Sequence, residues 1–93
     1  MFLEIVTPEA VIFSSDVTSV AVPGINGEFQ ILNNHAPIVS VLTSGKVRVD
    51  VANASIDEKF QNRFNKENDG KLSFTINSGT LEMKDNKAII LAD

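Results

Sequence analysis

Residues 46–51 read Lys-Val-Arg-Val-Asp-Val, so that three valines alternate with three charged residues. Successive side chains of a β-strand point to opposite faces, and this alternation therefore predicts a strand with one buried face and one face in water. The same two-residue period returns at 72–76 and at 80–84. A helical period of 3.6 residues is not seen in these stretches, and the chain is expected to build its core from sheets.

The pattern extends outward from this strand in both directions. Further strands are predicted at 2–6, 11–13, 17–22, 28–32, 38–42 and 88–92. Turn signals separate them, notably Pro23-Gly24, Asn26-Gly27 and Asp85-Asn86, because Gly and Asn tolerate the backbone conformations that tight turns require. Many short strands with turn signals every eight to twelve residues predict an all-β, antiparallel sandwich or barrel.

Length and composition predict one small domain and exclude several classes of function. A length of 93 residues predicts a single domain covering 1–93. The chain contains no cysteine and has a net charge of −4. A nucleic-acid-binding protein would carry a basic patch, and the sequence predicts no nucleic-acid partner. The longest apolar run, 88–92, has five residues, far fewer than the ~20 of a membrane helix. Membrane association is therefore expected only through partners.

Residues 52–70 interrupt the strand pattern and are polar with mixed charge. Ile56, Phe60 and Phe64 lie four residues apart, as on one side of a helix. One interpretation is a long polar hairpin insertion whose apolar residues fold back onto the edge of the sandwich. The alternatives are a short amphipathic helix that docks on a partner, and disorder.

The sequence contains no pattern that predicts catalysis, a cofactor or a metal site. Phosphate-binding glycine motifs are missing, and Asp85-Asn86 lacks the further acidic residues of a calcium loop. His35 is the lone histidine and the only side chain suited to act as a general base near neutral pH. It has no cysteine and no G-x-S-x-G serine near it, so no catalytic residue is predicted.

The segment 23–37 is dense in glycine, proline and isolated polar residues. Turns gathered at the end of a sandwich often form a contact surface. From composition alone, a contact surface and a purely structural role for these residues remain equal alternatives.

The order of residues within this segment resembles the epsilon subunit family of the rotary F-type ATP synthase, called delta in mitochondria. The resemblance is carried by Pro23-Gly24-x-x-Gly27-Glu28-Phe29 and by Ile31-Leu32-x-Asn34-His35-Ala36-Pro37. Flanking stretches also match the family's order, from Leu3-Glu4-Ile5-Val6-Thr7-Pro8-Glu9 through Gly45-x-Val47-Arg48-Val49 to Asp85-Asn86-Lys87-Ala88-x-Ile90-Leu91-Ala92-Asp93. Gln30 and Asn33 depart from it, because the family usually has glycine at the first position and often proline at the second.

The resemblance implies a flattened antiparallel β-sandwich of about ten short strands in the central stalk of the rotor. It implies two partners, the gamma subunit and the polar loops of the c-ring, with Glu28 facing the ring and His35 near gamma. The implied contact residues are Gly27, Glu28, Phe29, Asn34, His35, Ala36 and Pro37. The chain would be a non-catalytic subunit that clamps gamma to the ring, so that proton (or sodium) passage drives ATP synthesis.

Two further expectations concern the ends of the sequence. Most relatives continue into an inhibitory two-helix arm, and the sequence stops at Asp93 before it, which predicts no self-inhibition and no nucleotide site. The start at Met1 favours a bacterial cell, with the subunit peripheral at the cytoplasmic face of the inner membrane. The competing hypotheses are a small ligand-binding sandwich with His35 at the mouth of its pocket, and a structural adaptor domain.

Overall fold

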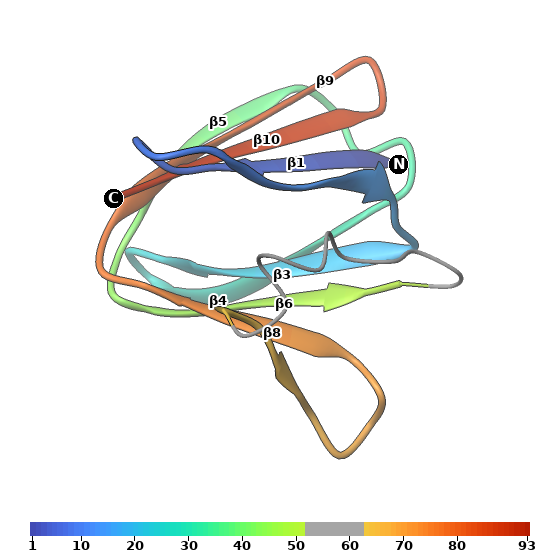
Figure 1. Cartoon of the computed structure of the whole chain (residues 1–93). Helices are drawn as coiled ribbons and strands as arrows, with labels where there is room; N and C mark the ends of the chain where they lie inside the picture. Colours follow the sequence, from blue (N-terminus) through green and yellow to red (C-terminus); the bar gives the residue numbers. More distant parts are fainter. Residues whose placement is uncertain (52–62) are drawn as a thin grey trace.

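The computed structural model describes residues 1–51 and 63–93 and contains ten β-strands (Figure 1). The strands are β1 Phe2–Val6, β2 Val11–Asp16, β3 Ser19–Gly24, β4 Gly27–Leu32, β5 Ile38–Leu42, β6 Gly45–Asp50, β7 Asn65–Lys66, β8 Leu72–Ile76, β9 Gly79–Lys84 and β10 Lys87–Ala92. Their number and lengths confirm the predicted all-β fold of about ten short strands.

The strands form one hydrogen-bonded sheet that folds over into two layers. Along the sheet the order is β2-β1-β10-β9-β5-β3-β6-β8-β7, and β4 pairs with β3 beside this path. Figure 1 shows β1, β5, β9 and β10 in one layer, here called the upper layer, above β3, β4, β6 and β8 in the lower layer. A single register pair, Gly24 with Leu42, joins β3 to β5 where the sheet passes from one layer to the other.

The core lies between the layers and confirms the predicted alternation. In β6, Val47 and Val49 are fully buried, while Lys46 and Arg48 are exposed on the opposite face. Every strand from β1 to β10 except β7 contributes buried apolar side chains to one cluster. Such a close-packed interior makes a small domain stiff, because it resists changes in volume and transmits strain.

One pairing differs from the antiparallel expectation. β1 and β10 run parallel, with Leu3 opposite Ala88 and Ile5 opposite Ile90, while the other strand pairs are antiparallel. Alternation in a sequence shows which face of a strand is buried, but it does not show the strand's partner or direction. The parallel pair joins the first and last strands and so completes the upper layer between β2 and β9.

Part of the predicted insertion at 52–70 lies outside the described residues, including Ile56 and Phe60. The described part contains a short strand, β7, which pairs with β8. Phe64 is buried between two other rings, with its centroid 6.0 Å from that of Phe13 and 5.5 Å from that of Phe74. At Phe64, therefore, an apolar residue of the insertion does fold back onto the sandwich.

The turn predicted at Asp85-Asn86 is confirmed. Both residues have left-handed backbone angles, with φ of 51° and 59°, between the paired ends of β9 and β10. Positive φ at both central residues characterises the type I′ hairpin turn, for which Asn and Asp are well suited.

Candidate functional site

The residues predicted to contact partners fall into two groups, at opposite ends of β4. Gly27, Glu28 and Phe29 begin this strand, whereas Asn34 to Pro37 follow its last residue and lead across to β5 (Figure 1). Each residue of a strand advances the chain by about 3.3 Å, so roughly 13 Å separates Glu28 from Leu32. The structure therefore does not gather the predicted residues into one cluster. We call residues 25–29 the Glu28 turn and residues 33–37 the Asn-His corner.

The Glu28 turn is a compact hairpin tip with an exposed carboxylate. Gly27 has a φ of 118°, a conformation that disfavours any residue with a Cβ atom. The ring of Phe29 lies against Gly24, where an added Cβ atom would come within 2.7 Å of it. The carboxylate of Glu28 forms an ion pair with Arg48, at 3.4 Å, and both side chains are about half exposed. The turn thus presents a charge whose direction is set by a neighbouring strand.

The Asn-His corner is exposed but internally ordered. Asn34 has a left-handed φ of 64°, and the His35 backbone N–H donates to the Leu32 carbonyl at 3.2 Å. The Nδ1 atom of His35 lies 2.7 Å from the carbonyl oxygen of Ala36. A carbonyl can only accept, so Nδ1 carries the proton, and Nε2 of the neutral ring is left as an acceptor. The imidazole therefore offers its remaining hydrogen-bonding capacity outward.

The two departures from the family pattern each form contacts that the usual residue could not form. Gln30 donates from Nε2 to the Ser19 hydroxyl at 3.3 Å. Asn33 accepts at Oδ1 from the Asn86 side chain at 3.0 Å and from the Met1 amino group at 2.7 Å. These side chains thus tie β4 and the corner to neighbouring parts of the sandwich.

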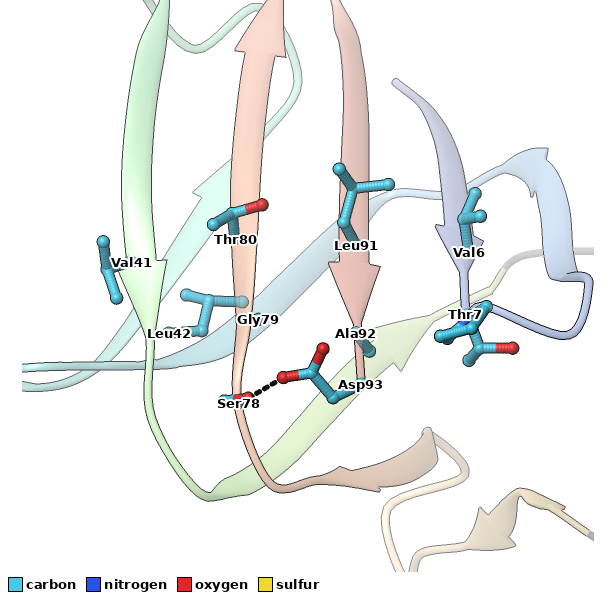
Figure 2. Close-up of a pocket in the computed structure, with 11 residues that line it drawn as sticks. Val6, Thr7, Val41, Leu42, Ser78, Gly79, Thr80, Leu91, Ala92 and Asp93 are labelled. Carbon is cyan, nitrogen blue, oxygen red and sulfur yellow. Dashed lines mark hydrogen bonds between the residues drawn. The ribbon is translucent and has the colours of Figure 1, made fainter.

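A row of mostly apolar side chains crosses the face of the upper layer that points away from the core. Strand register places its members side by side, in the order Val11, Val6, Leu91, Thr80 and Val41. Figure 2 shows the last four of them on adjacent strands, along a hollow of about 460 Å³. Ser78 and Asp93 also line the hollow, and the Ser78 hydroxyl donates to the Asp93 carboxylate. We call Val11, Val6, Leu91, Thr80 and Val41 the outer row.

The outer face of β5 extends from the outer row toward both predicted contact segments. Val39 and Val41 are 76% and 56% exposed, which is high for valine in the middle of a strand. A second hollow joins Val41 to Glu28 and Phe29, and a third joins Val39 to Pro37. The Glu28 turn, β5 and the Asn-His corner therefore form one continuous surface.

Sequence reasoning missed the outer row, although a signal for it was present. Residues 38–42 and 88–92 are almost continuously apolar instead of alternating. Strands of this kind are typically covered on both faces. In β5 and β10 the inner face packs in the core, but Val41 and Leu91 on the outer face stand 56% and 52% exposed. Runs of apolar residues in a half-exposed sheet indicate a surface that a partner covers.

Residues 1–51 and 63–93 contain neither a membrane-spanning helix nor a metal-binding cluster. No helix there is long and apolar enough to cross a membrane. Within the same ranges, histidine, aspartate and glutamate side chains form no group of three or more that could hold a metal ion.

A small sandwich with a continuous, partly apolar surface and an ordered charged turn has the character of a protein-binding module. Comparison with known families makes this specific. The family model described as ATP synthase, Delta/Epsilon chain, beta-sandwich domain matches residues 1–93, and the chain belongs to this family. Membership supports the expectation of a non-catalytic subunit of the synthase.

Individual relatives agree with this assignment. An ATP synthase epsilon chain from Chlorobium limicola is 42% identical over 91 residues, which cover 98% of this chain and 86% of the relative. One from Campylobacter curvus is 40% identical over 93 residues, but these make up only 60% of its length.

Solved structures show the same fold. A chain in the central stalk and c-ring structure of the Tetrahymena thermophila mitochondrial ATP synthase matches with a TM-score of 0.74 and 17% identity. The match covers 99% of this chain and 62% of that one. A chain of the Euglena gracilis mitochondrial enzyme gives a TM-score of 0.71 and 18% identity, over 97% of this chain and 48% of that one.

Proposed function

We propose that this chain is the epsilon-type rotor subunit of a proton-translocating F-type ATP synthase. In this role it clamps gamma to the c-ring and so couples ion flow to ATP synthesis. Residues 1–93 act as one domain, with the segment 52–70 as an insertion. The subunit sits peripherally at the cytoplasmic face of a bacterial inner membrane, attached only through its partners, and it binds no nucleic acid.

The observation that carries this proposal is the exposed apolar surface of the upper layer. Contiguous apolar patches on a small soluble protein commonly mark an interaction site. The outer row and Val39 would lose contact with water when gamma packs on them, and burial of apolar area drives most protein association. We therefore assign this face, together with the Asn-His corner, to gamma.

The dimensions of the molecule fit such an interface. Its principal extents are 31 × 26 × 25 Å. One face of a molecule this size is comparable with the ~800 Å² that each partner contributes to an interface of standard size. Glu82 on β9 lies opposite Val39 on β5, so the face mixes charged and apolar side chains, as non-obligate interfaces usually do.

The Glu28 turn lies at one end of this face and is assigned to the polar loops of the c-ring. Its carboxylate complements the basic and polar groups that the family resemblance implies for those loops. Charges at the rim of an interface contribute mainly to the association rate and to register. Ile25, which is 70% exposed at the tip of the turn, adds an apolar contact beside the charge.

A coupling part must also keep its two contact regions fixed relative to each other under load. The paired strands of the upper and lower layers connect the Glu28 turn to the corner through β4 on one side and β5 on the other. Because the interior between them is close-packed, torque applied at one end is transmitted to the other with little deformation.

The test is to purify the synthase from membranes of the source cell with a tagged form of this chain. The wild type is expected to recover gamma and the c-ring together. Glu28→Lys is expected to retain gamma and lose the ring. Asp50→Lys is the matched control, since it reverses a half-exposed carboxylate at the last residue of β6, in the lower layer, and should retain both partners.

Recovery of no synthase subunit with the wild type, under conditions that keep the complex intact, would contradict the proposal. The ligand-binding sandwich would then become the leading hypothesis, and ligands would be screened against His35. Equal loss of the ring with Asp50→Lys and Glu28→Lys would remove the specific role of the Glu28 turn.

A further inference from the structure

The Asn-His corner is joined to the hairpin between β9 and β10 by one side-chain amide. Asn86 accepts at Oδ1 from the backbone N–H of Asn34, at 2.7 Å, and donates from Nδ2 to Oδ1 of Asn33, at 3.0 Å. The partners are 52 and 53 residues away along the chain. Both ends of the Asn86 amide are thus used on adjacent residues of the corner.

Asn86 is itself firmly placed. It occupies the second central position of the type I′ turn, and its carbonyl accepts from the Phe2 N–H at 3.1 Å. The turn is closed by the register pair Lys84 and Lys87. The side chain therefore projects from a fixed point of the upper layer, the layer that carries the outer row.

The corner depends on such a fixed point for its orientation. The hydrogen bonds of His35, from its N–H to Leu32 and from Nδ1 to Ala36, remain within the corner or reach back to the end of β4. They hold the imidazole relative to the corner, but not relative to the outer face of the upper layer. The amide of Asn86 supplies a constraint of that second kind, in addition to the bond that the Met1 amino group donates to Asn33 at 2.7 Å.

We propose that Asn86 is a positioning residue for the gamma contact, which sets the direction of His35 relative to the outer row. The inference rests on the proposed function, because it takes the corner and the outer row as two parts of one gamma-binding surface. When Asn86 holds the corner in place, the imidazole Nε2 is already oriented before gamma arrives. Preorganisation of this kind raises affinity by removing an ordering cost from the binding step.

The key variant is Asn86→Gly, tested by titrating the chain into synthase from which the native subunit has been removed. Glycine adopts positive φ freely and Asp-Gly is a favoured type I′ sequence, so the hairpin is retained while both side-chain bonds are lost. The variant loses the two side-chain hydrogen bonds that position the corner, and we expect the affinity for the synthase to fall about three- to tenfold. Asn86→Asp keeps the acceptor for Asn34 and should lie between the wild type and Asn86→Gly.

A double-mutant cycle with His35→Ala distinguishes positioning from a general structural effect. If Asn86 acts through His35, Asn86→Gly causes no further loss of affinity once His35 has been truncated. Wild-type affinity of Asn86→Gly, alongside weakened binding of His35→Ala, would overturn the inference and leave the proposed function intact. An equal effect of Asn86→Gly in both backgrounds would overturn it as well. Failure of the wild type to bind at all would instead contradict the proposed function.

Discussion

Asn34 occupies a backbone conformation that most residues avoid. Its φ of 64° lies in the left-handed region, which costs L-residues about 1–2 kcal/mol but is tolerated by glycine and asparagine. Asn34→Ala should therefore lower the free energy of unfolding by about 1 kcal/mol, while Asn34→Gly should change it little. Urea denaturation of both variants checks this. Equal stability of the alanine and glycine variants would show that the backbone angle is not the constraint.

The ion pair between Arg48 and Glu28 matters for association more than for folding. Both side chains are about half exposed, and surface pairs of this kind contribute about 0–1 kcal/mol to stability. Arg48→Gln should leave the free energy of unfolding almost unchanged. It leaves the Glu28 charge uncompensated, and association with the ring should therefore be faster at low ionic strength. The difference should shrink as salt rises, because screening shortens the range of the charge.

Stopped-flow mixing at several salt concentrations measures this effect. Lys87→Gln is the control, since it removes the same charge from a pair with Glu4, at 3.1 Å, near the opposite end of the sandwich. Equal acceleration by Arg48→Gln and Lys87→Gln would mean that net charge, and not its position at the turn, governs the rate.

At the scale of elements, β5 is the strand whose outer face links the two contact segments. Val41 is 56% exposed, so Val41→Asp costs the isolated chain at most about 1 kcal/mol in strand propensity. The same charge buried against gamma without a partner is far more costly, and we expect at least about tenfold weaker binding. Thr75→Asp, on the exposed face of β8, is the control and should bind gamma normally.

The segment before β8 is held by Phe64. Its ring is buried between Phe13 and Phe74, and truncation of such a residue to alanine typically costs about 3–5 kcal/mol. Phe64→Ala should therefore shift the denaturation midpoint strongly. Phe2→Ala, at a half-buried ring on the outer face, should shift it much less. A small effect at Phe64 would mean that this part of the insertion is not integral to the core.

Strand positions were predictable, whereas their partners were not. The alternation of Val47 and Val49 with charged residues determines which side of β6 is buried, and the Asp85-Asn86 turn follows from local backbone preference. No local sequence signal predicts the parallel pairing of β1 with β10, because these are the first and last strands and the fold of the whole chain brings them together. For the same reason, β7 became visible only through its pairing with β8.

The sequence offered candidate contact residues, but it could not show how they are arranged in space. Resemblance selected Glu28 and His35, and a sequence cannot show that they lie at opposite ends of β4. The outer row is assembled by register from β1, β2, β5, β9 and β10. Its members are far apart in the sequence, so only the fold reveals that they form one surface.

The whole molecule is a compact body of two layers, about 31 × 26 × 25 Å, and the outer row lies on only one of its two outer sides. The outer face of the upper layer carries the outer row next to charged residues such as Glu82 and Lys84, whereas the lower layer carries the exposed Arg48, Gln30 and Lys46. This asymmetry allows one side to pack on gamma while the Glu28 turn, at one end, meets the ring.

The most direct test of this arrangement is site-specific crosslinking in the assembled synthase. The chain has no cysteine, so each variant carries a single reactive thiol. Glu28→Cys is expected to crosslink to a c subunit, Val41→Cys to gamma, and Thr75→Cys to neither. Crosslinking of Thr75→Cys to gamma with Val41→Cys unreactive would reverse the assigned faces, and failure of Glu28→Cys to reach the ring would contradict the clamp.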